Sequence, residues 1–226
     1  MNRFVYRAAT VISKYALLPI YSRITVTGVE NVPLTGPLVI ASNHLNDADP
    51  GILCTRIPRP IAFMAKIELF RVPGLAQFLR AFGAFPVKRG EADLSALRQA
   101  NQALESGLAV CIFPEGTREG PGEQLAEAWP GAALIAQRGA ATILPVAIHG
   151  SGRMALPKLF LYPHRRANVT LTIGEPFVLP KPARLNAEAA QEGTKLIMER
   201  IAALLPEANR GYYGYVKDDA NSAPPG

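Results

Sequence analysis

One histidine and the carboxyl groups that follow it are the first residues of this sequence whose spacing could support chemistry. His44 lies in the stretch ASNHLNDADP, directly after an apolar run, and is one of three histidines in the 226-residue chain. Asp47 and Asp49 follow it within the same stretch. A carboxylate bonded to one imidazole nitrogen fixes the tautomer and leaves the other nitrogen free to accept a proton. The pattern therefore indicates a His–Asp pair that activates a hydroxyl group.

Alternatives to this pair stay open at the level of sequence. On a continuous helix the separation of His44 and Asp49 would put them on different faces, so the pair needs a turn between a strand and a helix. Asp47 is a rival partner. Asp49 precedes Pro50 and could instead cap a helix, which would leave His44 as a half-buried structural side chain.

Two further polar clusters also follow apolar runs. FPEGTR, at residues 113–118, combines a glycine that lets backbone N–H groups approach a ligand with the guanidinium of Arg118, which suits phosphate or carboxylate. GAFPVKR, at residues 83–89, ends on two adjacent cations that suit a phosphate group. Lys66 ends a similar apolar run. Each cluster taken alone could also be an ordinary turn or a solvated charge.

The elements that must position these clusters alternate between strand and helix. Short apolar runs predict strands at 24–27, 38–42, 61–65, 85–87, 108–113, 143–148 and 169–173. Helical spacing predicts a helix that opens at residues 49–50 and further helices at 73–82, 93–106, 130–138 and 186–205. The alternation predicts an α/β fold with a central, largely parallel sheet flanked by helices. Ligands of such sheets bind beyond the carboxyl ends of the strands, so we expect the polar clusters to converge on one edge.

Composition favours one domain with an anionic partner. The length suits one large domain with a substantial core. Hydrophobic residues make up 49% and charged residues 19%, which excludes a disordered chain. The net charge of +6 suits phospholipid headgroups or phosphorylated metabolites, and we expect no nucleic-acid partner because the cations are scattered and no binding motif appears. Cys54 and Cys111 lie in apolar surroundings without metal-ligand spacing, so we expect reduced thiols and no metal site.

The N-terminal segment indicates contact with a membrane surface. Residues 1–24 are apolar and aromatic, but Arg3, Arg7, Lys14 and Arg23 interrupt them, so no stretch reaches the roughly 18–20 residues of a spanning helix. A cationic, aromatic helix of this kind fits the bilayer interface. A helix packed on its own domain is the alternative, and both can hold together. We divide the chain into this interfacial segment, a domain at 25–206 and a C-terminal tail at 207–226.

The blocks NHLNDAD, GAFPVKR, FPEGTR and LPVAI occur in that order, with spacing compatible with an α/β sheet. Together they resemble the four sequence blocks of the glycerolipid acyltransferase family, typified by 1-acylglycerol-3-phosphate O-acyltransferase (lysophosphatidic acid acyltransferase). The lead-in VTGVENVPLTGPLVIASNH and the segment AKIELF resemble the same family. The resemblance runs from about Val26 to Pro206.

The resemblance implies a role for each matching position. His44 would be the general base and Asp49 its orienting partner. Arg89 would bind the phosphate of the acceptor, with help from Lys66. The remaining site residues would shape the acceptor site: Glu115, Gly116, Thr117 and Arg118. We also expect a backbone N–H near Gly116 to stabilise the oxyanion.

We therefore expect an acyltransferase that moves a fatty acyl group from acyl-CoA or acyl carrier protein to the free hydroxyl of 1-acylglycerol-3-phosphate, a lysophospholipid, without a cofactor. We expect it at the cell membrane, peripheral or monotopic, on the cytoplasmic face. Many relatives carry lysines where residues 128–131 of this chain are AWPG. Fewer positive charges would therefore line the acceptor site. Another acceptor (glycerol-3-phosphate, a lyso-ornithine lipid or a glycolipid) and hydrolysis of the acyl thioester are the alternatives.

Overall fold

The structure is a computed structural model that describes residues 1–88, 93–116, 123–154, 166–182, 184 and 186–214. Its strands are β1 (Ser22–Thr27), β2 (Leu38–Ser42), β3 (Ile61–Lys66), β4 (Ala84–Val87), β5 (Ala109–Ile112), β6 (Thr142–His149) and β7 (Ala167–Ile173). Its α-helices are α1 (Arg3–Ile12), α2 (Leu18–Tyr21), α3 (Asp49–Arg56), α4 (Leu75–Phe82), α5 (Leu94–Glu105), α6 (Gly131–Arg138) and α8 (Ala187–Ala203). A π-helical turn, η1 (Ser13–Leu17), joins α1 to α2, and short 3-10 turns include η3 (Ile67–Arg71), η6 (Glu207–Asn209) and η7 (Gly211–Tyr213).

In the described residues the strands form one seven-stranded sheet in the order β1-β7-β6-β2-β5-β3-β4. The strands from β6 to β4 run parallel to one another, whereas β7 pairs antiparallel with β6 and parallel with β1. The prediction of a largely parallel α/β sheet is confirmed. Because the carboxyl ends of β6, β2, β5, β3 and β4 share one edge, the segments that follow these strands begin at that edge.

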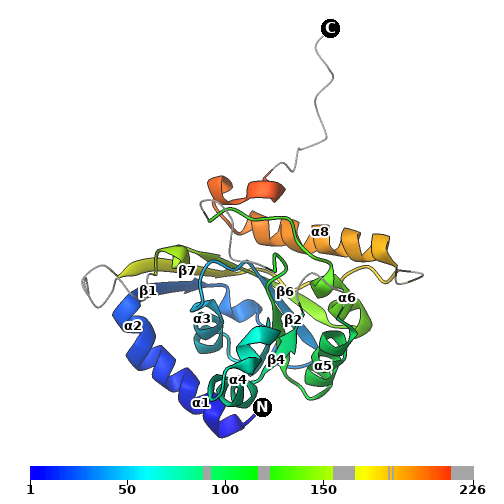
Figure 1. Ribbon diagram of the computed structural model, residues 1–226. Coiled ribbons are helices and arrows are strands. Elements are labelled where there is room, and N and C mark those ends of the chain that lie inside the picture. The colour runs from blue at the N-terminus through cyan, green and yellow to red at the C-terminus, as the bar shows by residue number, and fades with distance from the viewer. Residues whose placement is uncertain (89–92, 117–122, 155–165, 183, 185, 215–226) are drawn as a thin grey trace.

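Helices cover both faces of the sheet (Figure 1). Helices α1, α3 and α4 lie on one face, and α5, α6 and α8 lie on the other. Strand β2 is buried on both sides, because Leu38 and Ile40 enter the first core cluster and Val39 and Ala41 the second. Burial on both faces explains why this strand is a continuous apolar run rather than an alternating one.

The N-terminal helix is tied to the domain by Tyr6. Its hydroxyl donates to Cys54 Sγ at 3.3 Å and accepts from the Ile61 amide at 3.1 Å, while its ring stacks on Phe82 with centroids 5.2 Å apart. Burial raises the pKa of Tyr6 and raises the pKa of Cys54 to about 12, so both groups stay neutral. The helical run leads directly into β1, so the predicted boundary at residue 24 lies inside a strand of the sheet.

Pro145 lies in an interior strand, whereas a proline within the apolar run 143–148 suggests by sequence an edge strand or a bulge. Strand β6 pairs with β2 on one side and β7 on the other. The Pro145 carbonyl accepts from the Gly174 amide at 2.9 Å, just beyond the end of β7. In an extended chain the N–H and C=O of one residue point to the same side, so the missing N–H faces the end of β7 and leaves the ladder to β2 intact.

Candidate active site

His44 and Asp49 meet at the carboxyl end of β2. The Nδ1 atom of His44 lies 2.9 Å from Asp49 Oδ2, and both side chains are buried. An ionised carboxylate accepts hydrogen bonds, so it favours the tautomer in which Nδ1 carries the proton. Nε2 is then the acceptor nitrogen. The geometry is that of an imidazole prepared to take a proton from a hydroxyl group.

The chain turns back between His44 and Asp49, as the pair requires. Asp49 Oδ2 also accepts from the amides of Leu45 and Asn46, each at 2.7 Å. Helix α3 begins at Asp49 itself, after Ala48, which makes no side-chain capping bond. The carboxylate therefore organises the loop before the helix instead of capping the helix, and of the two candidate acids it is Asp49 that reaches the Nδ1 atom.

Two asparagines fix this loop to its neighbours. The Asn43 side chain donates to the Ile148 carbonyl at 2.8 Å and accepts from the Ile148 amide at 2.7 Å, which ties the end of β2 to β6. Asn46 Nδ2 donates to the Met154 carbonyl at 2.8 Å. Buried polar side chains with satisfied hydrogen bonds make a rigid support, so the imidazole stands on a fixed backbone.

The histidine ring stacks on a residue that lines an apolar cavity. It stacks on Phe113, at the end of β5, with ring centroids 4.0 Å apart and an angle of 17° between the planes. Phe113 also lines a cavity of about 370 Å³ between α5 and α6, at the ends of β3, β4 and β5. Apolar lining comes from Met64, Leu97, Leu134 and Ile135. A pocket of this size and character suits an aliphatic chain, and Phe113 is the residue that links it to the imidazole.

Glu115 supports the backbone of the site through two hydrogen bonds. Its Oε1 accepts from the His44 amide at 3.3 Å, and its Oε2 accepts from the Ala126 amide at 2.8 Å. The side chain is buried, and this burial raises the pKa of Glu115. We expected Glu115 to shape the acceptor site. In the structure its carboxylate faces two backbone amides.

Gly116 closes a tight turn beside the cavity. Its φ is +67°, in the left-handed region that favours glycine, and its amide donates to the Phe113 carbonyl at 3.1 Å. That amide is therefore engaged within the turn, and the amides that follow it, at residues 117–122, lie outside the described residues. The Trp129 ring covers Gly116, and a Cβ atom there would lie 3.2 Å from Cδ1 of the indole.

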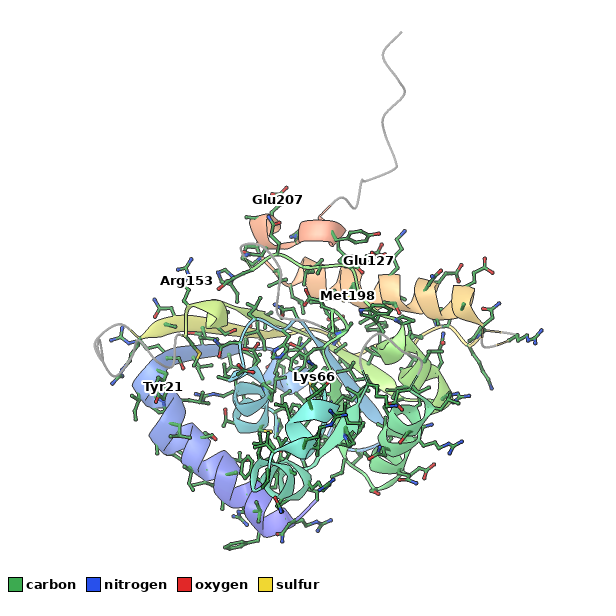
Figure 2. All side chains as sticks on the ribbon, viewed as in Figure 1. Tyr21, Lys66, Glu127, Arg153, Met198 and Glu207 are labelled. Atoms are coloured by element: carbon green, nitrogen blue, oxygen red, sulfur yellow. The ribbon has the colours of Figure 1, made fainter. Side chains whose placement is uncertain are left out.

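The predicted cations are only partly located. Lys66 is exposed at the end of β3, where its Nζ lies 3.9 Å from Glu68 Oε1 (Figure 2). Arg89, Thr117 and Arg118 lie outside the described residues. Within the described part of the chain no group of three or more His, Cys, Asp and Glu side chains is arranged to hold a metal ion.

The structure adds Phe113, to which the sequence analysis gave no role, because its ring stacks on the imidazole. It follows directly after an apolar strand that ends at the edge where His44 lies, which is the signal that could have identified it. Lys88, one of the two cations at the end of GAFPVKR, lines the cavity.

Comparison with known proteins agrees with this architecture. A family model described as Acyltransferase matches residues 23–149. The chain is 32% identical over 213 residues to the 1-acyl-sn-glycerol-3-phosphate acyltransferase of Bacillus subtilis, covering 93% of this chain and 94% of that protein. It is 27% identical over 156 residues to a chloroplastic 1-acyl-sn-glycerol-3-phosphate acyltransferase of Arabidopsis thaliana, covering 68% of this chain and 43% of the plant protein.

A solved structure shares the fold. The crystal structure of the 1-acyl-sn-glycerophosphate (LPA) acyltransferase PlsC from Thermotoga maritima matches with a TM-score of 0.66 and 25% sequence identity. The match covers 89% of this chain and 80% of that chain.

Proposed function

The chain belongs to the acyltransferase family, and from this premise we propose that it moves a fatty acyl group from an acyl thioester to the free hydroxyl of 1-acylglycerol-3-phosphate. The product would be phosphatidic acid, a precursor of phospholipids. One observation supports this function above the others. Phe113 stacks on the ring of the buried His44–Asp49 pair and also lines an apolar cavity, so a proton acceptor and a space for an alkyl chain share one neighbouring residue.

The proposed reaction needs no covalent acyl-enzyme. His44 Nε2 takes the proton of the acceptor hydroxyl, and the oxygen attacks the thioester carbonyl carbon. The carbon–sulfur bond then breaks, and the leaving thiolate takes a proton from the imidazolium. Asp49 keeps Nδ1 protonated and stabilises the positive charge that forms on the ring.

The acyl chain of the donor would occupy the cavity between α5 and α6. The carbonyl carbon would lie at the Phe113 end, against His44, and the methyl end among Leu97, Leu134 and Ile135. Burial of each methylene group contributes about 0.8 kcal/mol, so the cavity favours long acyl chains over short ones.

The phosphate of the acceptor would bind to cations at the same edge of the sheet. Lys66 ends β3 and pairs in register with Val87 of the adjacent β4, and Lys88 follows it. Arg89 and Arg118 are the further predicted contributors. An exposed lysine on α8, Lys195, forms a comparable pair with Glu199 at 3.8 Å and supplies a matched control. We expect Lys66→Ala to raise the KM for the acceptor and Lys195→Ala to leave it within about twofold.

The central experiment measures whether transfer depends on the acceptor. The purified protein is incubated with radiolabelled acyl-CoA, with and without 1-acylglycerol-3-phosphate, and the products are separated by thin-layer chromatography. We expect labelled phosphatidic acid in the presence of the acceptor and little free fatty acid in its absence. Free fatty acid at the same rate in both would identify a thioester hydrolase. Transfer to glycerol-3-phosphate or another lysolipid instead would correct the acceptor, and a parallel series with acyl carrier protein identifies the donor.

The N-terminal helices would hold this site at the cytoplasmic face of the cell membrane, as a peripheral or monotopic attachment. While Tyr6 faces the domain, Phe4 and Tyr15 are 81% and 71% exposed, and Val72 and Phe78 before and within α4 are exposed as well. Helices α1 and α4 pack together, so these side chains belong to adjoining elements. Exposed cations accompany them, which suits an anionic lipid surface. None of the helices among the described residues has the length and apolarity to span a bilayer.

A vesicle assay tests this attachment. Phe4→Ser combined with Tyr15→Ser should reduce sedimentation with vesicles of phosphatidylglycerol and phosphatidylcholine by about tenfold or more, because two large apolar side chains leave the interface. Val178→Ser is the control, since Val178 is 68% exposed outside these helices. Equal binding of the double variant and the control would exclude the proposed surface.

A further inference from the structure

The loop that precedes α6 is held by hydrogen bonds to other segments of the chain. Residues 123–129, which we call the bridging loop, form no strand or α-helix, yet Leu125 within the loop is buried. A buried backbone without regular structure needs hydrogen-bond partners from other segments, because an unpaired amide or carbonyl group is costly. The partners of this loop therefore show which parts of the molecule hold it in place.

The partners on one side of the bridging loop come from the C-terminal segment. The Leu125 amide donates to the Asn209 carbonyl at 3.1 Å, and the Tyr212 amide donates to the Leu125 carbonyl at 3.0 Å. The Ala128 amide donates to the Tyr213 hydroxyl at 3.1 Å. Figure 2 shows both segments on the α8 side of the molecule, where Glu127 and Glu207 are labelled.

These contacts involve the first residues of the segment that we predicted as a C-terminal tail, residues 207–226. Residues 207–214, which we call the C-terminal clamp, contain η6 and η7 and pack on the bridging loop. Gly211 has φ +46°, and a Cβ atom there would collide with the Leu125 carbonyl and amide. The close approach of the two backbones therefore depends on glycine at this position.

The partners on the other side of the bridging loop belong to the active site. The Ala126 amide donates to Glu115 Oε2, and the other oxygen of this carboxylate accepts from the His44 amide. The Trp129 amide donates to the Pro114 carbonyl at 2.9 Å. The loop thus joins the C-terminal clamp to the backbone of the histidine through one buried carboxylate.

We propose that the C-terminal clamp is a positioning element for acyl transfer: it holds the bridging loop against Glu115, and Glu115 holds the backbone of His44. The predicted effect on kcat rests on the proposed function. The clamp lies outside the part of the chain that the family model matches, which ends at residue 149. Tyr213 acts through Ala128 and the loop, and it touches neither His44 nor Asp49 in the contacts that join these segments.

The test removes one hydroxyl group from the clamp. Tyr213→Phe deletes the acceptor of the Ala128 amide and keeps the ring, and Tyr212→Phe deletes the neighbouring, exposed hydroxyl as a matched control, since Tyr212 meets Leu125 through its backbone. Loss of one such hydrogen bond should lower kcat by about fivefold in Tyr213→Phe and change it by less than about twofold in Tyr212→Phe. KM for the acceptor should stay within about twofold in both variants.

Amide hydrogen exchange, followed by NMR, separates positioning from general destabilisation. In Tyr213→Phe the amides of Ala128, Ala126 and His44 should exchange faster than in Tyr212→Phe, while the amide of Leu171 in β7 keeps its wild-type rate. Unchanged exchange at Ala126 and His44, or an equal increase at Leu171, would overturn the proposal. If Tyr213→Phe does not fold, Gln124→Ala removes a milder contact, from Gln124 Nε2 to the Ala208 carbonyl at 3.3 Å, and should shift the same amides.

Failure of this inference is distinct from failure of the proposed function. If the wild-type protein shows acceptor-dependent transfer and Tyr213→Phe equals the control in kcat, the clamp has no positioning role. If the wild-type protein shows no transfer, the proposed function fails, and the exchange rates still decide whether the clamp holds the backbone of His44.

Discussion

Two histidines of this protein follow apolar strands and lie near a carboxylate, but their surroundings differ. The His44 Nδ1 atom is 2.9 Å from Asp49, and the side chains are 9% and 0% exposed. The His149 Nδ1 atom, at the end of β6, is 3.4 Å from Glu123, and the side chains are 37% and 18% exposed. Glu123 has a positive φ of +63° and accepts from the Gly150 amide, whereas Asp49 accepts from two amides of the loop that carries His44.

A histidine close to a carboxylate is therefore not, by itself, enough to identify a general base. The His149–Glu123 pair is half-buried, so water screens it more and its electrostatic coupling is weaker. In the buried pair the His44 ring stacks on Phe113, which also lines an apolar cavity, and the proposed function places the thioester there. Burial and the neighbouring space therefore separate the two pairs, although both combine a histidine with a carboxylate.

The largest change in kcat is expected when His44 itself is replaced. His44→Ala should lower kcat by about 100-fold or more, since general base catalysis typically contributes 10²–10⁴-fold. His149→Ala, the matched control, should stay within about twofold. The measurement is acyl transfer by purified variants that have wild-type circular dichroism. Residual activity of His44→Ala near a tenth of wild type would remove the general-base assignment.

A smaller effect is expected from the acid partners. Asp49→Asn should lower kcat by roughly 10- to 100-fold, because the imidazole remains but its tautomer and its positive charge lose their support. Glu123→Gln should change kcat by less than about threefold, since the half-buried pair takes no part in the proposed reaction. Steady-state rates over a range of pH provide the check. Similar losses in both variants would show that the two pairs are not functionally different.

The smallest expected effect is on the free energy of unfolding, and it tests the burial of Glu115. Burial raises the pKa of Glu115, so the folded state binds its proton more strongly than the unfolded state does. The stability that this group supplies is present below its unfolded pKa and is lost as pH rises through the folded value. The free energy of unfolding of wild type, relative to Glu115→Gln, should therefore fall as pH rises from about 4 to about 7.

Asp93 provides the control of opposite sign. The Lys88 amide, followed by those of Ala96 and Ser95, lowers the pKa of Asp93 at the start of α5. Its stability contribution is present above the unfolded pKa and is lost as pH falls through the folded value. Wild type relative to Asp93→Asn should thus gain stability as pH rises, measured by urea unfolding at each pH. Parallel slopes for the two variants would contradict the assigned surroundings.

Much of the fold could be predicted because its signals are local. The apolar run of β2 and the helix spacing of α5 and α8 were read correctly from sequence, and the largely parallel sheet followed from their alternation. The interior place of Pro145 could not be predicted, because whether a missing N–H harms a sheet depends on where the neighbouring strand ends. That neighbour, β7, lies far along the chain.

The site could be predicted only in part. His44 and Asp49 were identified as a pair from residue type and from the resemblance, and the turn between them follows from a strand that ends and a helix that begins nearby. The orientation of Glu115 was not predictable, because its partners are the amides of His44 and Ala126, and both contacts form between distant segments. The role of the C-terminal clamp was hidden for the same reason.

Local patterns in the sequence predict the alternation of strands and helices. They also predict the edge of the sheet where we expect the active site, and the residue types that could act there. These features depend on hydrophobic periodicity and on neighbours within a few positions. Tertiary structure alone decided which histidine is buried, which side chain stacks on it, where an apolar cavity opens and which distant segment supports the loop. Those outcomes depend on packing between segments that the chain order does not bring together.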